Sequence, residues 1–177
     1  MNIYINEENI EDILQVEHVI TEAFGSREEA DLVSALRDDS GWIPALSLVA
    51  KDEKGNIVGH ALCTRSSIGT HPSLTLAPVA VLPEHQGKGI GCDLIKACID
   101  IGRKMGEKTM TVLGHPGYYP RFGFEQASIY GVTCSLSAGP DEAKMIMALD
   151  ETPIPGGEMG FCKPMSDAVK AYQPHDE

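Results

Sequence analysis

Basic residues are scarce in this chain of 177 residues, which has 14 lysines and arginines against 26 aspartates and glutamates. The resulting formal net charge of −12 argues against nucleic acid as a partner and weakly favours a cationic substrate. The same charge means that an anionic ligand must be captured by local groups, against the field of the whole molecule.

Long apolar runs are missing as well. No stretch reaches the roughly 20 apolar residues that span a bilayer, so we expect no membrane partner. The N-terminal sequence MNIYINEENIED is acidic and lacks the apolar core of a signal peptide, which predicts a cytoplasmic protein. The cysteines are odd in number and form no CxxC pair, so we expect free thiols and no metal at Cys63, Cys92, Cys98, Cys134 and Cys162.

Alternating strand and helix patterns fill most of the chain. The hydrophobic content of 42% suits one sizeable core, and neither a repeat nor a linker divides the sequence. We predict an α/β (α+β) fold with a mixed, mostly antiparallel sheet flanked by helices. The predicted strands are 3–5, 46–50, 57–65, 74–82, 109–113, 130–136 and 144–149, and the predicted helices begin after the caps Asn9 and Ser26 and at Ile90. Gly156 and Gly157 read as surface loop.

The stretch LTLAPVAVLPEHQGKGIG, residues 74–91, organises the rest. It predicts a buried strand, a glycine-rich turn and the start of an amphipathic helix. Gly87, Gly89 and Gly91 let the backbone turn sharply, and the first N–H groups of the helix lack partners within it. Lys88 adds a positive charge. This junction therefore predicts a site for a phosphate or pyrophosphate.

The spacing of the loop decides between kinds of pyrophosphate site. A P-loop needs Ser or Thr after its lysine, but Gly89 follows Lys88, and Cys92 stands where a dinucleotide fingerprint needs Gly or Ala. The pattern Gln86-x-x-Gly89-x-Gly91 instead resembles the (Q/R)xxGx(G/A) signature of the GNAT superfamily of acyl-CoA N-acyltransferases.

The resemblance extends from residue 3 to about residue 149 through the order of predicted elements. It is closest to the YhbS-like branch of predicted acetyltransferases, through AFGSREEADLVSALR, the central block and LGHPGYYPRFGF. It implies a single N-acetyltransferase domain over residues 1–177, in which 151–177 is a loosely matched C-terminal extension.

The resemblance also implies a set of site residues. Gln86, Gly87, Lys88, Gly89, Ile90 and Gly91 would hold the pyrophosphate, and the backbone of Val79, Ala80 and Val81 would hold the pantetheine arm. In this family the central strand separates from its neighbour through a bulge, and an N–H near Val81 would polarise the thioester carbonyl. Tyr119 matches the tyrosine of Tyr-x-x-x-Gly-Phe that faces the thioester sulfur, and we expect Tyr118 to be a packing residue.

A general base is harder to identify. The central strand carries no glutamate where many relatives have one. The candidates are His115, His71, His60, Glu22 or a water molecule. Arg121 and Arg65 are candidates for contacts with the coenzyme's phosphates.

The expected function is transfer of the acetyl group of acetyl-CoA to a primary amine by direct attack in a ternary complex. The alternative is a non-catalytic acyl-CoA-binding sensor or docking module, and a nucleotide-dependent oxidoreductase is a distant third. The amine belongs to a small molecule or a peptide that docks between residues 22–37 and the late strands. If the chain self-associates, a homodimer is the expected form.

Overall fold

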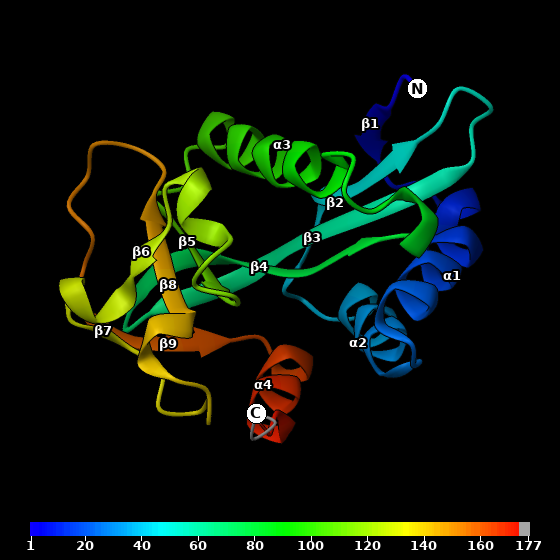
Figure 1. Cartoon of the computed structure of the whole chain (residues 1–177). Helices are drawn as coiled ribbons and strands as arrows, with labels where there is room; N and C mark the ends of the chain where they lie inside the picture. Colours follow the sequence, from blue (N-terminus) through cyan, green and yellow to red (C-terminus); the bar gives the residue numbers. More distant parts are fainter. Residues whose placement is uncertain (174–177) are drawn as a thin grey trace.

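The computed structural model describes residues 1–173 and is built around a mixed sheet (Figure 1). Its main path runs β1-β2-β3-β4-β5-β8-β6, and β9 pairs with both β3 and β7. Only the β4–β5 and β7–β9 pairs are parallel among these residues. The strands are β1 (Tyr4–Glu7), β2 (Trp42–Lys51), β3 (Ile57–Ile68), β4 (His71–Val81), β5 (Thr109–Leu113), β6 (Glu125–Gln126), β7 (Val132–Thr133), β8 (Lys144–Ala148) and β9 (Gly157–Phe161).

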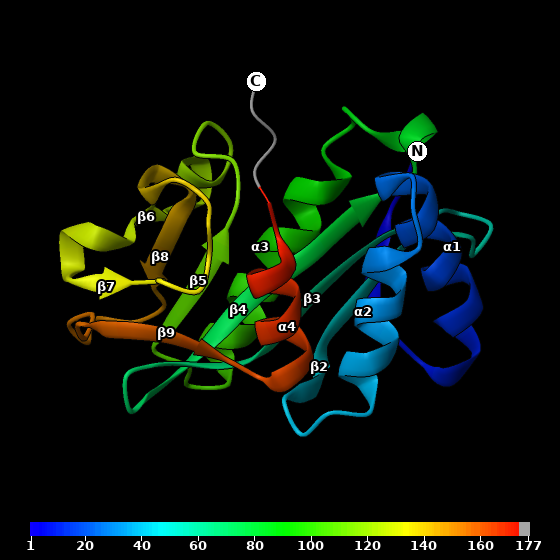
Figure 2. The same ribbon diagram turned by 90° about the horizontal axis from the view of Figure 1, so that it is seen from below.

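Helices cover both faces of this sheet. Helix α3 (Ile90–Lys104) lies on one face, where Leu94, Ile95 and Cys98 join the first of two core clusters. Helices α1 (Ile13–Phe24), α2 (Glu28–Arg37) and α4 (Lys163–Ala171) lie on the other face and close the second cluster (Figure 2). No helix within residues 1–173 is long and apolar enough to cross a membrane.

The structure confirms the predicted fold class and its local elements. The β2–β3 hairpin, α3 and β5 form where their patterns place them. Asn9 caps the chain before α1, because its side chain accepts from Glu11 N–H and the Asp12 carboxylate accepts from Asn9 N–H. The second expected cap is different: Ser26 accepts a long bond from Glu28 N–H, and Arg27 occupies the cap position of α2.

The C-terminal third departs most from expectation. The strand predicted over 130–136 is wrong beyond Val132–Thr133, which pairs with β9 and not with β8. The loop prediction is confirmed at Gly156, which is exposed and outside any strand, but it is wrong at Gly157, where β9 begins and then pairs antiparallel with β3. Residues 174–177 of the predicted extension lie outside the described residues.

The separation of β4 from β5 positions the site. The two strands pair only at Leu74 and Thr75, although β4 continues to Val81. On the other side of β4, Cys63 faces Leu76 while Ala61 faces Val79, so two steps along β3 match three along β4. This bulge bends β4 and leaves one edge of its last residues without a partner strand.

Candidate active site

The turn between β4 and α3 depends on glycines with left-handed backbone conformations. Gly87 has a φ angle of +75° and Gly89 one of +85°, values that residues with a Cβ rarely adopt. A Cβ at either position would meet no heavy atom within 4 Å. The loop therefore needs these glycines for their backbone angles, and the space beside them is open to a ligand.

Gly91 differs, because it already belongs to α3. A Cβ there would lie 3.5 Å from the Tyr118 hydroxyl oxygen and 3.7 Å from the Val81 side chain, which is ordinary contact. An alanine therefore fits at this position, in agreement with the Gly-or-Ala tolerance of the signature.

Unpaired main-chain donors gather at this turn. Within the described chain, the backbone N–H groups of residues 87–92 donate to no protein acceptor, and no side chain caps α3. The first intrahelical bond runs from Asp93 N–H to the Gly89 carbonyl at 3.0 Å. These donors lie at the positive end of the helix dipole and form a site for an anion.

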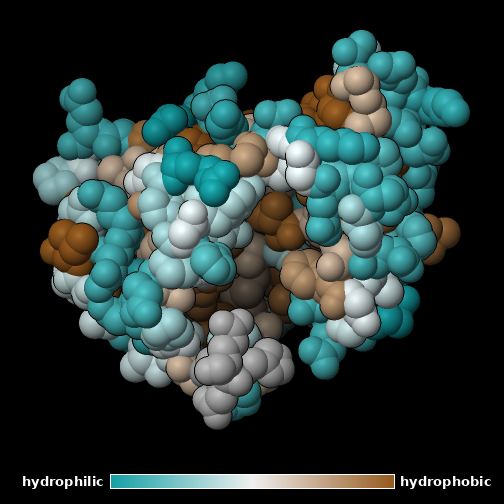
Figure 3. Space-filling view, in the orientation of Figure 1, coloured by the Kyte–Doolittle hydropathy of each residue, from teal (hydrophilic) through white to brown (hydrophobic). Residues whose placement is uncertain are grey.

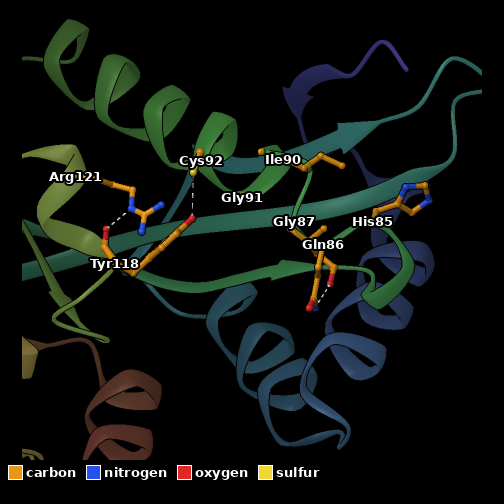
Figure 4. Close-up of a pocket in the computed structure, with 10 residues that line it drawn as sticks. His85, Gln86, Gly87, Ile90, Gly91, Cys92, Tyr118 and Arg121 are labelled. Atoms are coloured by element: carbon orange, nitrogen blue, oxygen red, sulfur yellow. Dashed lines mark hydrogen bonds between the residues drawn. The ribbon is translucent and has the colours of Figure 1, made fainter.

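A cavity of about 410 Å³ adjoins these donors (Figure 4). It is large enough for a phosphorylated ligand, and it brings residues of β4, the turn and α3 together with the segment that follows β5. Its lining residues are Val81, His85, Gln86, Gly87, Gly89, Ile90, Gly91, Cys92, Tyr118 and Arg121. Lys88 is not among them, so the charge predicted for the loop does not border this cavity.

Gln86 connects the turn back to the strand. Its side-chain amide donates to the Val81 carbonyl oxygen at 3.0 Å. Leu82 N–H donates in the opposite direction, to the Val58 carbonyl on β3. The peptide groups of Val81 therefore point away from β3, toward the unpaired edge, and strand alternation directs those of Val79 the same way. The peptide groups of Ala80 point toward β3.

Two adjacent tyrosines lie differently in this site. The Tyr118 hydroxyl is 3.4 Å from the Cys92 sulfur, so Tyr118, which was expected only to pack, lines the cavity. Tyr119 lies deeper, edge-on to Phe124 with ring centroids 5.8 Å apart. Burial raises the pKa of Tyr119, and its hydroxyl has no hydrogen bond to any described residue. Tyr119 is not among the residues that line the cavity, and its predicted catalytic role stays a prediction.

Comparison with known proteins assigns the family. Residues 44–126 match the family model of the acetyltransferase (GNAT) domain. The uncharacterized N-acetyltransferase YhbS of Escherichia coli (strain K12) is 31% identical over 121 residues, which are 67% of this chain and 71% of YhbS. The chain belongs to the GNAT family of acetyltransferases.

Further GNAT proteins agree with this assignment. The uncharacterized N-acetyltransferase YjhQ of the same strain is 48% identical over 118 residues, 64% of this chain and 65% of YjhQ, slightly under two thirds of its length. The crystal structure of E. coli YhbS in complex with CoA has a TM-score of 0.83 and 26% identity, covering 90% of this chain and 89% of that one. A GNAT acetyltransferase from Brucella melitensis in complex with acetyl-CoA has a TM-score of 0.77 and 28% identity, with 93% and 98% covered. The predicted family and its YhbS-like branch are confirmed.

The structure separates the histidines that sequence analysis offered as the GNAT general base. His71 begins β4, at the opposite end from the cavity. His60 is fully buried, and burial together with the charge of Arg37 lowers its pKa to about 3. His115 is exposed, and its Nδ1 accepts from Gly117 N–H at 3.0 Å. His71 is thus excluded by position and His60 by its low basicity, whereas His115, the exposed Glu22 and water remain.

The two arginines that were candidates for contacts with the coenzyme's phosphates lie in different places. Arg65 binds both carboxylate oxygens of Glu107, at 2.8 and 2.6 Å, and lies away from the cavity, so a contact with the coenzyme there is not supported. Arg121 lines the cavity. Sequence reasoning missed His85 and Cys92 as cavity residues, although both lie within one residue of the predicted loop.

Proposed function

We propose that this protein is an N-acetyltransferase that transfers the acetyl group of acetyl-CoA to a primary amine by direct attack. The observation that carries the proposal is the row of unpaired N–H groups from residue 87 to residue 92, next to a cavity that all of these residues except Lys88 line, beside the free edge of β4. Backbone donors at a helix start suit a diphosphate, and an unpaired strand edge suits the amide groups of a pantetheine arm. The solved GNAT relatives in complex with CoA and acetyl-CoA support this choice of ligand.

In this proposal, each chemical task except removal of the amine proton is assigned to one residue. The N–H group of Val81 points to the free edge and would donate to the thioester carbonyl as its oxygen gains charge; such a donor contributes about 2.7–4 kcal/mol. The amine nitrogen forms the new C–N bond while the C–S bond breaks. The Tyr119 hydroxyl would donate to the departing sulfur, and the proton lost by the amine would pass to His115, Glu22 or water.

In this proposal, the amine acceptor reaches the thioester through a hollow in the surface. Figure 3 shows a hollow with a hydrophobic floor between the part of the molecule that carries α1 and α2 and the part that carries β6 and β7. Figure 1, in the same orientation, places the separation of β4 and β5 between these parts. Apolar surroundings disfavour a charged amine and lower its pKa. A primary amine attacks only in its neutral form, and deprotonating an amine of pKa near 10.4 costs about 4.6 kcal/mol at pH 7, so a lower pKa favours the reaction.

The test measures binding and turnover separately. CoA binding is first measured by titration calorimetry. The rate of free-thiol release from acetyl-CoA is then measured with each of a panel of small amines and of peptides that carry a free N-terminal amine. We expect CoA to bind and at least one amine to accelerate thiol release. Binding without acceleration by any amine would favour the alternative, a non-catalytic acyl-CoA sensor, and no binding would refute both. The predicted cytoplasmic location and homodimer stay predictions.

A further inference from the structure

The coenzyme cavity has a second wall, opposite the glycine turn, made by Tyr118 and Arg121. Arg121 is the only lining residue with a permanent charge, because Lys88 of the turn does not border the cavity. In a chain of net charge −12, this guanidinium is the one permanent positive charge among the described residues that line the cavity.

Two contacts hold Arg121 in position while leaving its end free. Its Nε donates to the Tyr118 carbonyl at 2.8 Å, and its Cζ lies 4.4 Å from the centroid of the Tyr118 ring. It forms no ion pair with any residue of the described chain, and both terminal nitrogens lack a protein acceptor. A guanidinium fixed at Nε presents its remaining N–H groups as a planar fork, which matches two oxygens of a phosphate.

Tyr118 in turn is fixed across the cavity. Its hydroxyl reaches the first turn of α3, 3.4 Å from the Cys92 sulfur. Its ring packs edge-on against Tyr119 and Phe122, with centroids 5.1 and 5.5 Å away. The ring that supports Arg121 is therefore tied to the same helix end that supplies the unpaired N–H groups (Figure 4).

We propose that Arg121, supported by the ring of Tyr118, is a coenzyme-binding residue that donates a pair of N–H groups to the diphosphate of CoA from the side opposite the turn. The assignment rests on the proposed function. It extends that function by giving an acidic protein a charged partner for the phosphates, beyond the partial charges of the main chain. Tyr118 acts as a positioning residue for this arginine.

The central experiment compares Arg121→Gln with Arg27→Gln. Both arginines are exposed and both substitutions remove one positive charge, but Arg27 lies at the start of α2. By calorimetry, Arg121→Gln should weaken CoA binding roughly 10- to 100-fold, the range for a lost charge-assisted contact, while Arg27→Gln changes it less than about twofold. Arg121→Lys should fall between, because it keeps the charge and loses the fork. In turnover, Arg121→Gln should raise KM for acetyl-CoA and leave kcat nearly unchanged.

Shortened ligands identify the phosphate. If Arg121 binds the diphosphate, Arg121→Gln should lose affinity equally for CoA and dephospho-CoA and show no loss with pantetheine. A loss that disappears with dephospho-CoA would move the contact to the 3′-phosphate and overturn the assignment. In a Tyr118→Leu background, Arg121→Gln should cause a smaller loss of CoA affinity, because the ring that positions the guanidinium is absent.

Two results separate this inference from the proposed function. If wild-type protein binds CoA and Arg121→Gln binds it equally well, the role of Arg121 is refuted and the proposed function stands. If wild-type protein does not bind CoA, the proposed function itself fails.

Discussion

Replacing Gly89 with valine tests the conformational basis of the turn between β4 and α3. The substitution introduces no clash, since a Cβ at Gly89 meets no heavy atom within 4 Å. Its cost comes from the φ angle of +85°, where an L residue loses about 1–2 kcal/mol and a β-branched residue more. The chain can relieve this strain only by turning the loop, and that movement redirects the N–H groups that follow.

Gly106 provides a control substitution in the same protein for the effects of Gly89→Val on stability and on CoA binding. Gly106, just past the other end of α3, has a φ angle of +80° and equally open space around its Cβ position, yet lies outside the cavity. Gly106→Val should therefore cost similar stability, about 2–4 °C in Tm for each kcal/mol in a chain of this length. It should leave CoA affinity unchanged. Gly89→Val should lose at least one amide–phosphate bond, worth about 1.5–3 kcal/mol, or roughly 10- to 150-fold in Kd.

The assays are thermal unfolding and calorimetric titration with CoA, run on both variants and the wild type. If folded Gly89→Val binds CoA within twofold of Gly106→Val, the turn is not the phosphate site and the reasoning from its glycines is wrong. Gly89→Asn should restore part of the affinity, because asparagine tolerates the left-handed region better than other residues do.

Four further predictions concern single side chains. Tyr119→Phe should lower kcat about 10²–10⁴-fold, and Tyr118→Phe should change kcat much less. Because burial raises the pKa of Tyr119, the difference in kcat between wild type and Tyr119→Phe should persist from pH 7 to 10. Gln86→Ala should lower the free energy of unfolding by less than about 1 kcal/mol but weaken CoA binding several-fold. Gln86→Glu should weaken CoA binding more, because a carboxylate cannot donate to the Val81 carbonyl. CoA should protect Cys92 from a maleimide and leave the labelling rate of Cys162, which is outside the cavity, unchanged. For His60, the folded-state pKa of about 3 lies below the unfolded value near 6.5, so the unfolded state binds the extra proton and stability falls as pH drops. Between pH 6.5 and 5, the unfolding free energy of the wild type, measured in urea, should fall by about 1.6 kcal/mol more than that of His60→Gln.

The parts of the fold that sequence could predict are those set by nearby residues. The hairpin around residues 52–56, the helix from Ile90 and the cap at Asn9 each depend on contacts within a few positions along the chain. The same holds for the turn, where glycines at fixed spacing adopt the predicted sharp geometry. These elements required no knowledge of which strands would meet.

The parts that sequence could not predict depend on distant partners. β9, with the sequence GEMGF, has little alternation of its own and becomes a strand because β3 extends past β2 and offers Ser66–Ile68 for pairing. Tyr118 and Tyr119 are adjacent and identical in type, so spacing alone could not decide which faces α3. That choice follows from the contact between Tyr118 and Cys92, 26 positions apart.

The proposed phosphate site would explain how an acidic chain can bind an acidic coenzyme. Repulsion from distant carboxylates is screened within about 10 Å at 0.1 M salt, whereas the main-chain donors of residues 87–92, which have no protein acceptor, would contact the phosphate directly. Apart from proline, which has no N–H group, a substitution leaves these donors in place and can weaken them by changing the backbone angles, as at Gly87 and Gly89. In the proposal above, Arg121 adds a charged side chain to these donors. Glycine variants therefore measure the main-chain contribution, Arg121 variants measure the side-chain contribution, and their double variants show whether the two act on one phosphate group or on separate ones.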